Sequence, residues 1–142
     1  FRRGKLGGLQ INTREERIMP FGIITICYTG VVFLFQAKFS SLFLITEIMA
    51  GIAITQACCT IITTKYKISV HSIGVSGVLG VLLALQLNLS ELDLFLPIVG
   101  VILLAGVAMT ARLALNAHNI WQIAYGFLLG FGLNFGLIWW IG

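Results

Sequence analysis

Long apolar runs separated by short polar segments form the main pattern of this sequence. Five such runs extend over about residues 19–37, 40–63, 70–89, 92–113 and 120–141. Each is close to the roughly 20 residues that an α-helix needs to cross a bilayer. The runs are too long for strands, and their apolar residues do not alternate with polar ones. The pattern predicts an all-α fold: a polytopic membrane helical bundle of about five transmembrane helices.

Short connections join these runs and predict how the helices are arranged. The segments QAKFSS and NLSELD leave room only for a direct reversal of the chain, so consecutive helices are expected to be antiparallel. We expect an up-and-down bundle over residues 19–142, preceded by a polar membrane-surface segment over residues 1–18. Pro20 suits the first turn of the first helix, where its missing N–H is not needed.

Antiparallel threading assigns each connection to one of two membrane sides. Side B receives Lys38, Glu91 and Asp93. Side A receives the N-terminal segment and the connections TTKYKISVHS and ARLALNAHN, and with them eight of the nine cations and both histidines. Its candidate residues come from three segments far apart in sequence: Arg14, Arg17, Lys65, Lys67, Ser69, His71, Arg112, His118 and Gln122.

The composition supports a membrane protein and narrows its partners. Hydrophobic residues make up 58% of the chain and charged residues 10%, against about 25% charged residues in a soluble domain. The mean hydropathy is +1.01. A formal net charge of +4 favours anionic lipid headgroups or phosphorylated substrates, and no interleaved basic and aromatic residues indicate nucleic acid. The three cysteines lie inside apolar runs, which is typical of small packing residues.

Small and polar residues inside the runs predict helix packing. Glycines recur at three- and four-residue spacing, which lets membrane helices approach closely, either within this chain or in a homodimer. Three amide side chains are expected to form hydrogen bonds between helices. These residues are Gly74, Gly77, Gly80, Gly126, Gly130, Gly132, Gly136, Gln56, Gln86 and Asn134.

Two interpretations of side A remain open from the residues alone. The positive-inside rule explains cations as markers of cytoplasmic loops. It does not explain two histidines, nor Lys67, Ser69 and His71 packed directly before an apolar helix. Arg and Lys bind phosphate oxygens, and a pair of histidines can supply a nucleophile or base and an acid for phosphoryl transfer. No acidic cluster accompanies the histidines, so we expect neither a metal nor another cofactor.

The segment ARLALNAHNIWQ resembles the third motif, S-R-x5-H-x3-D, of the type-2 phosphatidic acid phosphatases. These are membrane-embedded lipid phosphatases related to vanadium haloperoxidases. Arg112 and His118 stand at the motif's spacing, Ala111 replaces Ser, and Gln122 replaces Asp. His118 and Gln122 are four residues apart, so both lie on one face of a helix that begins near Asn116 or Asn119.

Two further segments resemble the other motifs of the family. ISVH corresponds to P-S-G-H and keeps Ser69 and His71. NTREERIMP corresponds to the end of K-x6-R-P and offers Arg17 or Arg14, with Pro20 displaced and no Lys at the family spacing. Motif order and intervening helices extend the resemblance over most of the chain. Because the family's core has six helices, the resemblance implies one more helix upstream.

The resemblance implies a phosphatase that acts on a lipid phosphate or diphosphate, such as phosphatidate or a polyprenyl diphosphate. His118 would form a phosphohistidine and His71 would protonate the leaving group. Gln122 would orient His118. The implied phosphate ligands are Arg112, Arg17, Ser69, Lys67, Lys65 and Arg14, and no metal is needed. Loss of the charged Asp is expected to cost rate.

Other functions compete with this one. A weakened or inactive phosphatase-like subunit, with a structural or binding role and a homodimer or membrane-complex partner, would keep these partial motifs. A transporter would need polar residues along a path through the membrane. We expect an integral membrane protein of a bacterial inner membrane. The cation distribution places side A in the cytoplasm, whereas the resemblance often implies an extracytoplasmic site.

Overall fold

Five long α-helices form the part of the chain that the computed structural model describes, namely residues 15–39 and 41–141, with side chains from residue 18 onward. The described residues contain no strand, so the predicted all-α fold is confirmed. All five helices are long and apolar enough to cross a membrane, as expected of an integral membrane protein. The helices are α1 (Glu15–Lys38), α2 (Phe43–Thr63), α3 (Val70–Asn88), α4 (Phe95–Ala114) and α5 (Ile120–Ile141).

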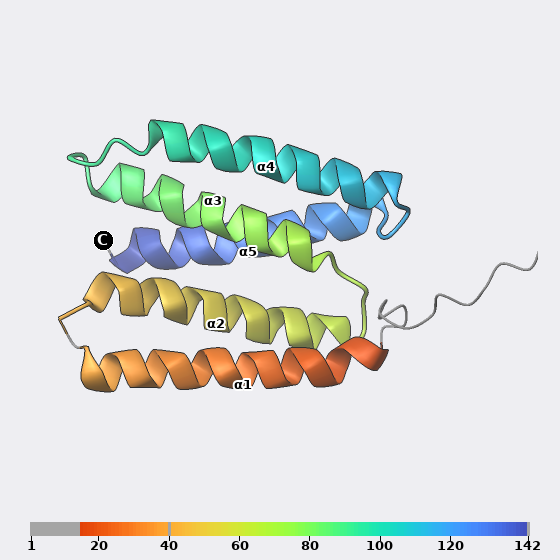
Figure 1. Ribbon diagram of the computed structural model, residues 1–142, viewed down its shortest axis with the longest axis horizontal. Helices are drawn as coiled ribbons and strands as arrows, with labels where there is room; N and C mark the ends of the chain where they lie inside the picture. Colours follow the sequence, from red (N-terminus) through yellow and green to blue (C-terminus); the bar gives the residue numbers. More distant parts are fainter. Residues whose placement is uncertain (1–14, 40, 142) are drawn as a thin grey trace, which may run out of the picture.

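The helices run alternately up and down and lie side by side (Figure 1). One end of the bundle holds the start of α1, the α2–α3 connection and the α4–α5 connection, which is the predicted composition of side A. The central pair is α3 and α5. On one flank α4 packs on α3, and on the other α2 packs on α5 and carries α1.

Burial falls steeply from the centre of this row to its edges. Ala105 is the one buried residue of α4, and the described side chains of α1 include none. Both outer helices therefore present large apolar side chains on their outer faces, among them Phe33 and Leu103. In water such surfaces would be unfavourable, whereas in a bilayer they face lipid tails of the same polarity.

The expected helix bounds need three corrections. α1 begins at Glu15, four residues before the expected start at residue 19, because Glu and Arg are good helix formers that extend it into the polar region. Pro20 therefore lies inside α1, and its placement in the first turn was wrong. Figure 1 shows the first turn of α1 at an angle to the rest, as expected of a helix with an internal proline. α2 and α4 each begin three residues later than expected.

Glycines allow the close approach of α3 and α5. A Cβ atom at Gly126 would lie 2.7 Å from the carbonyl oxygen of Ser69, and one at Gly130 would overlap the carbonyl of Ile73. A Cβ at Gly80 would lie 2.7 Å from the Phe131 carbonyl oxygen. These contacts are with backbone, which cannot rotate away. Packing within the chain is thus confirmed for these glycines and for Gly77, but not for Gly74, Gly132 and Gly136, which have open space in the single chain. For these three, packing in a homodimer stays a prediction.

Asn134 ties three helices together at mid-membrane, as predicted. Its Nδ2 donates to Thr55 Oγ1 of α2 and to the Gly130 carbonyl of α5, each at 2.9 Å, and it lies against Gly77 of α3. Gln86 behaves differently from the prediction. Its amide binds the backbone of Leu92 and Leu94 at 2.9 and 2.7 Å, so it holds the α3–α4 connection rather than a second helix.

Candidate functional site

The site on side A begins with the way α4 ends. The amide of Asn116 donates to the Leu113 carbonyl, and the amide of Ala117 donates to the Arg112 carbonyl. Together with the left-handed φ of 50° at Asn116, these bonds form a Schellman motif. Asparagine adopts this conformation more readily than most residues. The five residues between Arg112 and His118 therefore end α4 and form a tight turn that leads into α5.

The start of α5 places Gln122 beside His118. Asn119 Oδ1 accepts from the Gln122 amide at 2.9 Å, and Gln122 Oε1 accepts from the Asn119 amide at 3.4 Å. This reciprocal pair is a capping box, which satisfies two amides that the first turn leaves without helical partners. Gln122 is thus both a helix cap and a neighbour of the histidine.

Gln122 contacts the ring of His118 at Nδ1. The Gln122 oxygen lies 2.9 Å from Nδ1 of His118, which is a buried residue. The same oxygen faces the Asn119 amide, which can only donate, so this end of the side chain is the acceptor. Nδ1 then donates to this oxygen, and Nε2 is the ring nitrogen that Gln122 does not contact. Gln122 holds the ring through an uncharged amide.

The second histidine lies at the start of α3. Ser69 is the N-cap of α3 and is fully buried; its Oγ accepts from the Ser72 amide at 3.4 Å and from the Ser72 hydroxyl at 3.0 Å. Ser69 fixes the first turn of α3, and its role as a phosphate ligand stays a prediction. His71 is the exposed second residue of that turn.

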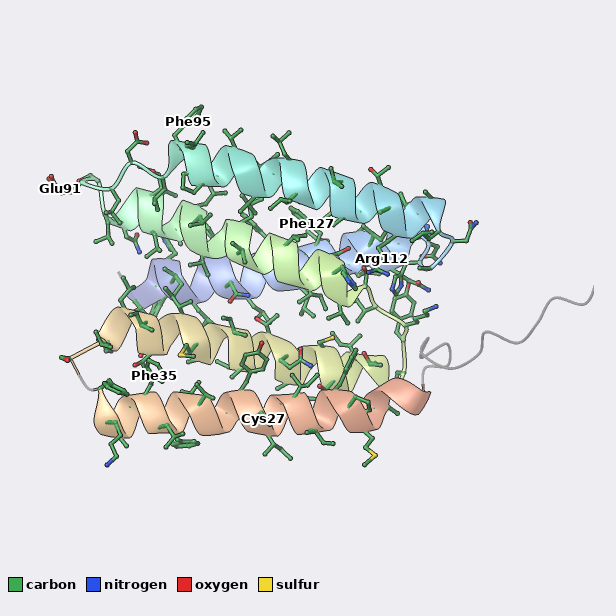
Figure 2. The ribbon with its side chains drawn as sticks, viewed as in Figure 1. Cys27, Phe35, Glu91, Phe95, Arg112 and Phe127 are labelled. Carbon is green, nitrogen blue, oxygen red and sulfur yellow. The ribbon has the colours of Figure 1, made fainter. Side chains whose placement is uncertain are left out.

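Arg112 reaches from the last turn of α4 to His71. A terminal nitrogen of its guanidinium contacts Nε2 of His71. Guanidinium is only a donor, so this ring nitrogen is the acceptor of the contact. Figure 2 shows Arg112 at the end of the bundle opposite Glu91. The site therefore contains a fixed positive charge, whereas the acidic side chain of Glu91 lies at side B.

One backbone contact joins the two histidine-bearing segments. The amide of Ser69 donates to the carbonyl of Gln122 at 3.2 Å. Gly126 has no side chain, which lets the start of α5 approach the start of α3 to this distance. His71 lies two residues after Ser69, and His118 is held by the side chain of Gln122. Among the predicted residues, the structure thus brings together Ser69, His71, Arg112, His118 and Gln122.

The remaining predicted residues are two lysines and two arginines of side A. Lys65 is exposed and Lys67 half-buried in the α2–α3 connection, on either side of Tyr66, whose ring makes an edge contact with Tyr125 of α5 at 5.9 Å. Arg14 lies outside the described residues. Arg17 belongs to α1, but its side chain is outside the described part. The lysines and Arg112 add to the positive charge of this end.

A cluster of buried apolar side chains packs between the helices near the site. Cys59, Ile68 and Ile73 are buried together, and half-buried side chains of all neighbouring helices except α4 pack around them: Phe21, Ile62, Val70 and Leu129. Cys59 is therefore a packing residue, as expected. No described cysteine forms a disulfide, and no group of three or more possible metal ligands occurs among the described residues.

Sequence reasoning missed two residues that shape the site. Asn119 carries the capping box, and the pattern Asn-x-x-Gln before an apolar run is the signal that indicates it. Asn116 carries the left-handed turn, for which an Asn just beyond an apolar helix is the signal. Neither forms part of the resemblance, because both act on the backbone.

Comparisons with protein-family models, with curated proteins and with solved structures gave no match to this chain.

Proposed function

We propose that this protein is a metal-independent phosphatase of lipid phosphates or diphosphates, acting at the membrane surface on side A. The arrangement of two histidines supports this proposal: His118 is held through Nδ1 by Gln122, and His71 contacts the arginine that would bind the phosphate. A neutral His118 held in this way would offer the lone pair of Nε2 as nucleophile, and His71 would act as the acid once its ring is protonated.

The proposed reaction proceeds in two balanced steps. A phosphoryl group binds Arg112, whose guanidinium then leaves His71, so that Nε2 of His71 takes up a proton from solvent water. Nε2 of His118 attacks phosphorus, the bond to the leaving oxygen breaks, and His71 gives that oxygen its proton. Water then attacks phosphorus, the bond between phosphorus and His118 Nε2 breaks, and the proton of the attacking water goes to His71. The products are the lipid alcohol, or the monophosphate from a diphosphate, and inorganic phosphate.

Purified protein is expected to release phosphate from a lipid phosphate in the presence of EDTA. His118→Ala is expected to lower that rate by more than about 10³-fold, since loss of a nucleophile removes the covalent step. An acid-labile phosphoprotein should form from radiolabelled substrate in the unmodified protein only. The matched control is Asn88→Ala at side B, which removes a hydrogen bond to Ile138 but no proposed site residue. Full activity of His118→Ala would refute the mechanism.

A phosphate-binding membrane subunit without turnover is the second candidate, and one observation favours it. Gln122 has a structural task in the capping box, so its presence beside His118 does not require catalysis. Such a protein would bind inorganic phosphate or vanadate through Arg112 and release no phosphate from any lipid. Titration of the protein with vanadate, with and without Arg112→Lys, separates binding from turnover.

A further inference from the structure

A long groove lies between α2 and α3 and begins beside the candidate site. Its volume is about 420 Å³, within the range of small-molecule sites. On α3 its lining extends from Val70 to Leu82, so at 1.5 Å per residue it is about 18 Å long. Val70 lies between Ser69 and His71, and therefore the groove reaches the site of the proposed reaction.

The groove opens sideways toward lipid rather than into the bundle. Ile52 and Val78 line it and remain 39% and 50% exposed, and Gly74 on the same wall is exposed as well. The opening exists because α3 packs chiefly on α5, and α2 chiefly on α1. Figure 1 shows α2 and α3 flanking α5, which forms the back of the groove through Asn134. A chain in the bilayer can thus enter without crossing the bundle.

Charge and polarity differ along the groove in the way an amphiphile requires. At side A its lining begins at Val70, next to His71 and its partner Arg112, and most of its wall residues are apolar. A molecule that fits both parts has an anionic head and a hydrocarbon tail. A volume of about 420 Å³ over a length of about 18 Å is enough for one hydrocarbon chain along α3.

Four polar residues line the groove, and two of them, Thr55 and Asn134, are hydrogen-bonded to each other. Gln56 of α2 and Tyr28 of α1 border it, and neither side chain makes a hydrogen bond to another residue that the structure describes. In hydrocarbon an amide or hydroxyl without a partner is unfavourable. An alkene offers a weak π acceptor to such donors, which a saturated chain lacks. This favours an unsaturated, prenyl-type chain as the occupant.

We propose that the α2–α3 groove binds the hydrocarbon chain of a single-chain, unsaturated lipid phosphate whose head occupies the side A site. This inference rests on the proposed function for the reaction at the head, but chain binding can be measured without turnover. The groove selects long-chain substrates, and Gln56 and Tyr28 contact the chain.

The test fills the groove with a leucine. Gly74 lines the groove and a Cβ there meets nothing within 4 Å, so Gly74→Leu occupies the groove without a backbone clash. Gly136→Leu on α5 is the matched control, since that glycine is equally open but does not line the groove. A diazirine-bearing prenyl phosphate is photolysed with each protein, and labelled peptides are mapped.

We expect the probe to label residues 48–56 and 70–82 in the unmodified protein and in Gly136→Leu. In Gly74→Leu the labelling of these residues is expected to fall at least tenfold. The same substitution should lower kcat/KM about tenfold or more for the long-chain prenyl phosphate. It should leave a water-soluble short-chain phosphate ester unaffected. If the groove is labelled but neither substrate releases phosphate, the proposed reaction is rejected and chain binding in the groove is still supported.

Three outcomes would overturn the inference. The first is an equal change in the labelling of the groove residues by Gly74→Leu and by Gly136→Leu. The second is equal labelling by a saturated alkyl phosphate of the same length, which would reject the unsaturated chain. The third is preferred labelling by a two-chain phosphatidate probe, which would reject a single-chain groove.

Discussion

The two ends of the bundle use polar side chains in different ways. At side B, Gln86, Asn88 and Asp93 bind backbone groups of a loop or a helix end. At side A, two of the contacts join side chain to side chain, Arg112 to His71 and Gln122 to His118. Backbone partners stabilise a turn, whereas a side-chain partner on a histidine influences the orientation of its ring. The contrast is consistent with the reaction proposed for side A and with a structural role of the side B contacts.

The largest effect in this comparison is expected from Arg112→Lys. Lysine keeps the charge but loses the planar fork that binds two phosphate oxygens. A lost charged hydrogen bond of about 1.5–3 kcal/mol corresponds to a loss of roughly 10–100-fold in kcat/KM. Phosphate release and vanadate affinity measure it.

Lys38→Ala at side B is the control for this substitution. It removes an exposed cation from the last turn of α1 and is expected to leave both readouts unchanged. If the two substitutions had equal effects, the contrast between the two ends would be wrong.

A smaller effect is expected from moving α3 relative to α5. Gly126→Ala places a methyl group 2.7 Å from the Ser69 carbonyl oxygen, and the backbone there must shift. Overpacking of this kind costs about 1–3 kcal/mol, and it displaces the contact between Ser69 and Gln122. We expect a lower melting temperature in detergent and a reduced rate of phosphate release.

Gly136→Ala on the same helix is the matched control near side B. Nothing lies within 4 Å of its added Cβ, so stability and rate are expected to stay within error. An equal fall in melting temperature for both substitutions would show that the α3–α5 approach is not specific to the site.

The smallest effect is expected from Gln122→Glu. Glu has the same length, retains the acceptor for His118 and for the capping box, and adds the charge that stabilises a positive ring. Phosphate release is expected to rise by about tenfold, since a charged partner of histidine can be worth several kcal/mol. A rate below that of the unmodified protein, with unchanged melting temperature, would contradict the orienting role of Gln122.

The helix count anticipated much of this arrangement. Apolar runs of membrane length determine that helices form, and short connections determine that they alternate. This placed both histidines and Arg112 at one end. The helix starts were less predictable, because polar residues such as Asp93 bind the local backbone at the membrane edge. The role of Gln86 was misjudged because its side chain binds local backbone groups.

The sequence by itself determined the membrane class, the number of spans and the side on which the ionisable residues meet. These properties follow from hydrophobicity and chain length, which are local and additive. The tertiary structure decided which glycines pack, that Arg112 contacts His71, and that α2 and α3 leave a groove beside the site. These depend on how α3 and α5 approach, and a distance between helices is a property of the packed pair that neither helix encodes alone.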